Sequence, residues 1–474
     1  MQSAQDGTAH RTLLRGLAVA MLLSEAAATT GAVPGIVDGG LAGALALPFF
    51  APSLLGALAA QLLLRPHRRE LAATAAIAAV LAMPFSNLLA GVEHGLVIAI
   101  ASAAGIASLA VLGVAALPSM ATGPRDASTE SALHVDAGGP TCARAADVLV
   151  PALLLPCFTL LAWPMVFLTA ALWPTTFDER LFLADAAFGA PLSFVVGAAT
   201  ANVPGLAGLL LAVYVALPLA LMLVHVLRTR DAPGSNDTLV AFVAVTVVGC
   251  VGYHLVPVAG PAYAFGDLFP SSPPDPSALS TGRTLVLPMP RNCMPSLHSA
   301  WALLVWWNAR PLSAVPRAAA AAFLGLTLLA TVGLGFHYVV DLVAAFPLTM
   351  AAQAWSMRTR AAALRRIAIA GGLAVTLAWM AFVTWSDAML ATPPPLLWAT
   401  ALAVVFGSSW LRSRIDDPGM EDASGAGNGS VPSASRTVMP STSSGPRITA
   451  RLKHPPPATA TYGMHRRRPA PRKP

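Results

Sequence analysis

Apolar runs of about 20 residues recur along most of this chain, and a run of that length can cross the hydrocarbon core of a membrane as a helix. Hydrophobic residues make up 56% of the 474 residues and charged residues 11%, whereas soluble proteins have about 45–50% and about 25%. We therefore expect an all-α polytopic membrane protein, not a soluble enzyme. Runs bounded by charge, Gly or Pro predict about 12 transmembrane helices, near residues 16–33, 41–64, 71–91, 95–118, 148–173, 204–227, 238–258, 295–309, 318–335, 338–357, 367–386 and 396–411.

Two apolar segments do not have the form of ordinary spans. Arg11 and Arg15 precede an apolar run, as in a cleavable signal peptide, but Glu25 interrupts that run, which favours a retained first span. Residues 181–203 contain Asp, Gly and Pro among apolar residues. This mixture favours an interfacial or re-entrant segment over a span.

The basic residues predict the orientation of the chain. Of the 29 Lys and Arg, 17 outside the C-terminal tail fall on one side of the predicted spans, and only Arg180, Arg283 and Arg291 fall on the other. The positive-inside rule then places both termini in the cytoplasm. The Ala- and Arg-rich composition favours a bacterial inner membrane as the location.

The net charge of +7 does not indicate a nucleic-acid partner. The basic residues form short clusters between apolar runs or in the tail, which is typical of membrane orientation and not of a nucleic-acid-binding face. The four cysteines, Cys142, Cys157, Cys250 and Cys293, show no C-x-x-C spacing, so they predict neither a disulfide framework nor a zinc site.

Changes in composition divide the chain into five regions. The Ser-, Pro-, Gly- and Arg-rich tail cannot bury enough apolar surface to fold, and its basic end could contact anionic lipid, although a solvated tail is the simpler interpretation. The predicted regions are four N-terminal spans (1–118), a cytoplasmic linker (119–146), a catalytic core (147–357), two further spans (358–413) and a disordered basic tail (414–474).

Three ionisable residues lie at the extracytoplasmic ends of predicted spans: His298, His337 and Asp341. Polar groups at membrane depth are costly and indicate function. His298 follows Pro295-Ser296, which predicts a position in the first turn of a helix, where anions bind readily. Two crossings return the chain to the same side at His337, and the i,i+4 spacing predicts that His337 and Asp341 share one helical face.

This constellation suits phosphoryl transfer. One histidine, oriented by the carboxylate, can attack phosphorus while the other protonates the leaving oxygen. Arg283 and Arg291 lie just before His298 and are predicted partners for the phosphate charge. The other interpretation is that both histidines cap helices at the membrane interface and that Asp341 is a buried pairing group.

The motifs Pro295-Ser296-Leu297-His298 and His337-Tyr338-Val339-Val340-Asp341, two crossings apart, resemble the P-S-x-H and H-x-x-x-D motifs of the type 2 phosphatidic acid phosphatase superfamily. Thr331-Val332 and the Pro257-x-x-Gly260-Pro261 pattern look like the branch that contains inositol phosphorylceramide synthases. The resemblance covers about residues 145–357, a six-helix phosphatidic acid phosphatase-like core.

The resemblance implies a metal-independent reaction without a cofactor, in which His337 is the nucleophile, Asp341 its partner, His298 the acid and Ser296 a phosphate contact. The chain departs from the family in three ways. It lacks the K-x6-R-P motif, Leu297 replaces a small residue, and Thr331 stands where an arginine usually precedes the nucleophile. We therefore expect Arg291 and Arg283 to hold the phosphate instead.

Three functions remain open from the sequence. A phosphatase of lipid phosphate esters is the leading one, and a phosphotransferase that moves an inositol-phosphate or similar head group would use the same histidines. A non-catalytic transporter or scaffold is the alternative from another class. Thr331, Tyr338 and His254 are expected near the substrate, although a packing role is the simpler interpretation of His254.

Overall fold

The computed structural model describes residues 40–121, 139–231, 237–282, 285–287, 289–357 and 362–416. The predicted first span, the centre of the predicted linker, Arg283 and nearly all of the predicted tail lie outside these residues. Helix α5 continues to Ala121 and α6 begins at Gly139, so both helices extend into the range of the predicted linker.

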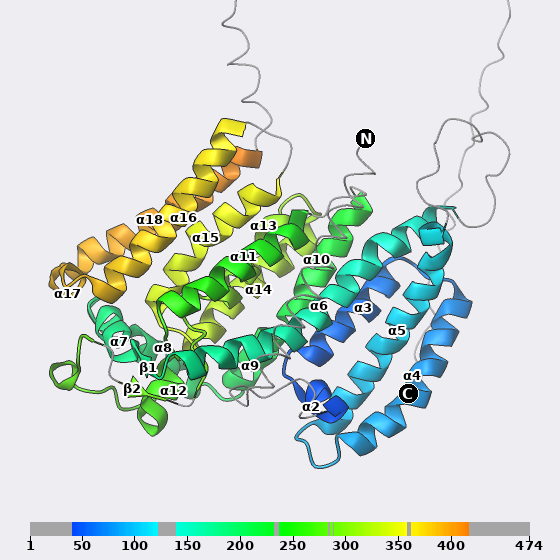
Figure 1. Cartoon of the computed structure of the whole chain (residues 1–474), viewed down its shortest axis with the longest axis horizontal. Helices are drawn as coiled ribbons and strands as arrows, with labels where there is room; N and C mark the ends of the chain where they lie inside the picture. Colours follow the sequence, from blue (N-terminus) through cyan, green and yellow to red (C-terminus); the bar gives the residue numbers. More distant parts are fainter. Residues whose placement is uncertain are drawn as a thin grey trace, which may run out of the picture. The chain divides into compact units, whose positions relative to one another are not determined.

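Helices make up almost all of the described chain (Figure 1). The part before residue 179 contains α2 (Gly40–Ala46), α3 (Phe50–Leu63), α4 (Arg68–Leu88), α5 (Gly95–Ala121), α6 (Gly139–Leu172), the strand β1 (Thr175–Thr176) and the start of α7 (Asp178–Ala186). The middle contains α8 (Leu192–Ala201), α9 (Leu206–Val215), α10 (Leu217–Asp231), α11 (Asp237–Leu255), α12 (Pro261–Phe265), the short 3₁₀ helices η1 (Gly266–Leu268) and η2 (Pro276–Ala278), and the strand β2 (Leu285–Val286). The last part contains α13 (Leu297–Ala309), α14 (Ala314–Gly333), α15 (Val339–Ser356), α16 (Ala362–Trp385), α17 (Ala388–Ala391) and α18 (Pro394–Asp416).

Among the described residues, seven helices are long and apolar enough to span a membrane. They lie in α4, α5, α11, α14, α15, α16 and α18. A bent pair, α8 and α9, would raise the number to eight if it counts as one span. The chain is therefore an all-α polytopic membrane protein, but the expected number of about 12 spans is not confirmed.

The difference arises where Pro and Gly interrupt the apolar runs. The predicted span 41–64 divides into α2 and the 14-residue α3, and the predicted span 204–227 divides into α9 and α10. The segment 181–203 forms parts of α7 and α8, and α8 meets α9 at an angle of 113°. That bend is the form expected of a broken span or a re-entrant segment, which the sequence indicated here.

The outer surfaces of the long helices are apolar. On α4, Val80 and Met83 are 74% and 73% exposed, and α18 exposes Phe406 and Trp410 in the same way. A water-soluble monomer seldom exposes large contiguous apolar surfaces. These faces therefore suit contact with lipid.

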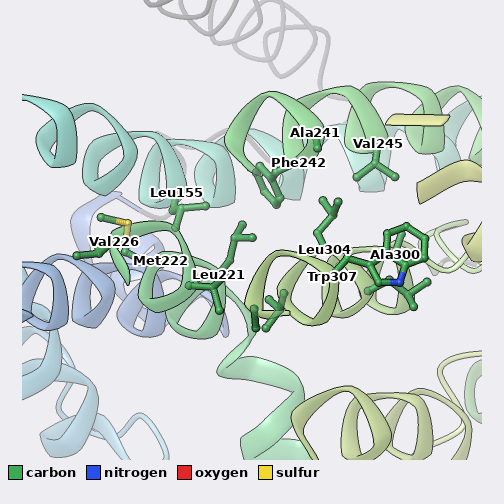
Figure 2. Packing of buried hydrophobic residues seen from close by; sticks show 14 of the residues in the cluster. Leu155, Leu221, Met222, Val226, Ala241, Phe242, Val245, Ala300, Leu304 and Trp307 are labelled. Carbon is green, nitrogen blue, oxygen red and sulfur yellow. The ribbon is translucent and has the colours of Figure 1, made fainter. Parts of the chain in front are cut away.

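The largest buried cluster joins helices from distant parts of the chain (Figure 2). It packs α6, α10, α11 and α13 against one another through the labelled side chains Leu155, Leu221, Met222, Val226, Ala241, Phe242, Val245, Ala300, Leu304 and Trp307. Because lipid tails are as apolar as these side chains, close van der Waals packing between the helices stabilises the cluster. This cluster fixes the position of α13, which carries His298.

Short elements gather at one end of the long helices (Figure 1). There, β1 and β2 form an antiparallel pair with Thr175 opposite Val286 and Thr176 opposite Leu285. The helices α7, α9 and α12 lie at the same end. The starts of α13 and α15 meet, because the N–H of Ser296 donates to the carbonyl of Asp341, and the N–H of Val339 donates to Asp185 of α7. Residues far apart in the sequence can therefore meet in one site at this end.

Candidate active site

Ser296 begins the helix that carries His298. Its hydroxyl accepts a hydrogen bond from the N–H of Ser299 at 3.3 Å and donates one to the Ser299 hydroxyl at 2.9 Å. A Cβ on Gly249 of α11 would lie 2.3 Å from the end of the Leu297 side chain, so a larger residue there would require Leu297 to shift. Ser296 thus acts as the helix cap, and His298 lies in the first turn of α13 as predicted.

A tight turn after α14 positions His337. The N–H groups of Phe336 and His337 both donate to the carbonyl of Thr331, at 3.1 and 3.0 Å. The turn passes through Gly335, whose φ is +74°, and His337 comes two residues before α15 begins at Val339. Thr331 therefore orients the histidine through its main chain.

His337 and Asp341 meet, but not on one helical face as the spacing predicted. His337 precedes α15, whereas Asp341 lies in its first turn and accepts the N–H of the capping residue Tyr338 at 2.8 Å. This capping arrangement brings Asp341 Oδ2 to 3.6 Å from His337 Nδ1. Both side chains are buried, with exposed fractions of 2% and 0%.

The two histidines line the same cavity, which has a volume of about 310 Å³. Their ring centroids lie 6.4 Å apart, and the rings are inclined at 58°. Tyr214 stacks on the ring of His298, and its hydroxyl lies 3.0 Å from His298 Nδ1. His298 Nε2 is buried and has no hydrogen-bond partner within the described part of the chain.

Cys293 contacts the same carboxylate as His337. Its thiol donates to Asp341 Oδ2 at 2.6 Å, and burial together with Asp341 raises the pKa of the Cys293 thiol well above its usual value. Within the described residues, Cys293, His337 and Asp341 form the one group whose ligating atoms lie close enough together, within 4.8 Å, to hold a metal ion. In this arrangement the Cys293 thiol is a hydrogen-bond donor to the carboxylate that faces His337.

A buried carboxylate that the sequence analysis did not single out, Asp178, holds the turn before α12 against Tyr338. Its oxygens accept the N–H groups of Ala259 and Gly260 at 3.0 and 2.8 Å and the Tyr338 hydroxyl at 3.1 Å. Burial raises the pKa of Asp178, and these hydrogen bonds oppose the rise. Asp178 thus fixes the residue that directly follows His337.

Asp185 supports α15 in a similar way. It accepts the N–H of Ser193 at 2.6 Å and the N–H of Val339 at 3.0 Å. Burial raises its pKa from 3.8 to about 7, with a further contribution from the charge of Asp341. An acidic residue inside an apolar segment was the local signal for Asp185, and that signal does not specify a partner. Asp178 lies beside Glu179 and Arg180, before that segment, and gave no such signal.

The predicted phosphate-binding arginine Arg291 is fully buried and bound to the main chain. Its guanidinium donates to the carbonyls of Trp173, Pro174, Leu287 and Met289, and its N–H donates to Thr169 Oγ1. Burial lowers the pKa of Arg291. Arg291 is not among the residues that line the cavity, so its donors hold the loop before α13.

The other predicted residues lie around the site without lining the cavity. His254 accepts a hydrogen bond from Trp173 Nε1 at 3.1 Å, which is the packing role considered above. Thr331 donates its hydroxyl to the carbonyl of Leu328 at 2.8 Å. Ser296, Thr331, Tyr338 and His254 all lie outside the cavity lining.

Comparison with known proteins gives no match among the curated proteins or the solved structures. The family model of the PAP2 superfamily does match, over residues 179–355, from the first turn of α7 to the end of α15, and this segment contains His298, His337 and Asp341. This match supports a phosphatase or phosphotransferase type of function in a membrane.

Proposed function

We propose that the protein is a metal-independent phosphatase of lipid phosphate esters that acts through a phosphohistidine. The observation that carries the proposal is the pair of histidines, 6.4 Å apart, that line one cavity in an apolar membrane protein. The distribution of basic residues supports cytoplasmic termini and an active site on the extracytoplasmic side. The Ala- and Arg-rich composition favours a bacterial inner membrane.

In the first step, His337 Nε2 attacks phosphorus and the bond from phosphorus to the ester oxygen breaks. Nδ1 of the same ring faces Asp341, which stabilises the positive charge on the ring during the attack. The leaving oxygen takes a proton from His298 Nε2, the nitrogen without a described partner.

In the second step, water attacks the phosphohistidine and gives its proton to His298. Phosphate leaves, and both histidines return to their first state. Tyr214 keeps the ring of His298 in place during both transfers through its contact with Nδ1. If a hydroxyl of another lipid or head group replaces water, the same steps give a transferase.

The start of α13 is the better anion site of the two helix starts near the histidines. Its first turn contains no acidic residue, and its cap is the neutral Ser296. The start of α15 instead carries Asp341, and Asp185 accepts the N–H of Val339. Since a helix N-terminus attracts anions when no carboxylate occupies it, the phosphate would lie beside His298. Arg283 stays a predicted ligand from the sequence.

The test is phosphate release from a panel of lipid phosphates by purified protein in EDTA. We expect release by the wild type, loss of release with His337→Gln, and little change with His254→Gln, a histidine outside the cavity lining. A labelled phosphoenzyme should form in the wild type and be absent from His337→Gln. His298→Gln should act far better on a nitrophenyl phosphate than on an alkyl phosphate, because the nitrophenolate needs no proton to leave.

Other results would change the assignment. Transfer to an added ceramide, diacylglycerol or inositol lipid without phosphate release would indicate the phosphotransferase. Absence of both reactions in folded protein would favour the non-catalytic transporter or scaffold. Release that His337→Gln does not reduce would refute the phosphohistidine.

A further inference from the structure

Part of the cavity wall comes from outside the segment that the PAP2 superfamily matches. The connection between α2 and α3 contributes Leu47, Pro48 and Phe49, and α6 contributes residues that include Phe158 and Val166. The match begins only at residue 179. The N-terminal helices thus form one side of the cavity that contains His298 and His337.

Phe49 lies beside His298 and Tyr214, where the proposed chemistry takes place. Its ring centroid lies 5.3 Å from the ring of His298 and 5.8 Å from the ring of Tyr214. Phe336, directly before His337, packs against Tyr214 at 4.9 Å, and the ring of Trp301 lies 5.3 Å from the ring of His298. Aromatic rings therefore surround the histidine that would protonate the leaving oxygen, which is the atom that carries the substrate chain.

Hydrogen bonds between helices hold Phe49 in this position. Phe49 caps α3, and its carbonyl accepts both the N–H of Ser53 at 3.0 Å and the Ser53 hydroxyl at 2.6 Å. The same hydroxyl lies 3.1 Å from the Thr159 hydroxyl on α6, and both polar groups are buried. Because α3 also packs against α10, the wall is part of the folded core.

We propose that Phe49 selects the substrate by limiting the size of the apolar chain that fits beside His298. This inference rests on the proposed phosphatase function. The cavity is lined mainly by apolar side chains, and its volume of about 310 Å³ lies at the small end of ligand pockets. A phosphate ester with one unbranched apolar chain fits this volume better than a lipid with two chains.

The test compares chain-length profiles in the full-length protein. The substrates are n-alkyl phosphates below their micellar concentrations, and kcat/KM is measured for each. For the wild type, each added methylene should raise kcat/KM by about fourfold until the cavity is full, since a buried methylene contributes about 0.8 kcal/mol. Phe49→Leu should move the end of this rise to longer chains, and Phe49→Trp should move it to shorter chains.

Phe50→Leu is the matched control. Phe50 is the next residue, but it packs into the cluster of Leu45, Leu54 and Phe85 and does not line the cavity. The control should keep the wild-type profile, and thermal unfolding should show that all three variants are folded. Identical profiles for folded Phe49→Leu, Phe49→Trp and wild type would overturn the proposal.

Binding separates this inference from the proposed function. The same series of n-alkyl phosphonates, which cannot be hydrolysed, is titrated by calorimetry. If phosphate is released but the Phe49 variants change neither the alkyl phosphate profile nor the alkyl phosphonate profile, the phosphatase proposal stands and the role of Phe49 is refuted. The opposite result is also possible: the protein shows no turnover, but replacement of Phe49 shifts the chain length that binds best. That result would support the role of Phe49 in the cavity wall and refute the phosphatase.

Discussion

Replacement of Gly260 by alanine tests whether the position of His337 depends on the close contact between two turns. Gly260 has φ +104° and ψ 156°, a region that is almost exclusive to glycine. A Cβ at this position would lie 2.5 Å from the carbonyl oxygen of Phe336, the residue before His337. The N–H of Gly260 also donates to Asp178 at 2.8 Å.

The expected effect follows from these distances. Ordinary van der Waals contact begins near 3.4 Å, whereas the added Cβ would lie 2.5 Å from the carbonyl oxygen of Phe336. This carbonyl must therefore move by about 0.9 Å. A displacement of about 1 Å in a catalytic group can cost about 10²-fold in rate. Backbone strain of about 1–3 kcal/mol and overpacking of about 1–3 kcal/mol should also lower the free energy of unfolding.

Gly266→Ala is the matched control, since Gly266 also has positive φ, +52°, but a Cβ there meets nothing within 4 Å. We expect both variants to lose stability in thermal unfolding, but only Gly260→Ala to lose kcat by about 10²-fold. If the two variants retain the same kcat as the wild type, the reasoning that links the Gly260 contact to His337 is wrong.

Three further predictions concern buried polar groups. Burial raises the pKa of Asp185 to about 7. The contribution of Asp185 to stability is therefore complete below pH 3.8 and is lost as the pH rises through about 7, by up to about 4 kcal/mol. Asp185→Asn should flatten the dependence of Tm on pH in this window. Arg291→Lys should lower the Tm without raising KM once folded, because Arg291 binds main-chain carbonyls; a raised KM with unchanged Tm would instead indicate phosphate binding. Tyr214→Phe should lower kcat about three- to tenfold on alkyl phosphates and less on nitrophenyl phosphate, since it removes the hydroxyl partner of His298.

Long uninterrupted apolar runs were predictable from the sequence. The helices α4, α5, α11, α14, α15, α16 and α18 each overlap a predicted span, because apolar composition over about 20 residues leaves few alternatives to a membrane helix. The predicted span 295–309 became the 13-residue α13, which at 1.5 Å per residue is about 20 Å long. Such a helix is shorter than the membrane core, and sequence length alone does not predict how packing compensates for this.

Only those residues of the candidate site that belong to local sequence motifs were predictable. Motif spacing predicted that His298 and His337 meet, because α13 and α14 pack against each other and return the chain to the cavity that both histidines line. Asp178 and Tyr214 have no local motif, since each acts through contacts with residues more than 80 positions away. Arg291 was predicted to bind phosphate because of its charge alone. In the structure its guanidinium is fully buried and donates to main-chain carbonyl groups instead.

The contact between Phe49 and His298 bears on how the N-terminal helices relate to the core. The predicted boundary at residues 119–146 separates two regions in the sequence, yet both regions line one cavity. If α3 moved away from α6, the Ser53 and Thr159 hydroxyls would each lose a partner, and the ring of Phe49 would leave His298. The proposed proton donor His298 would then be open to water, and Phe49 would no longer limit the size of the substrate chain beside it. With the proposed role of Phe49, the N-terminal helices and the core form one unit of substrate recognition.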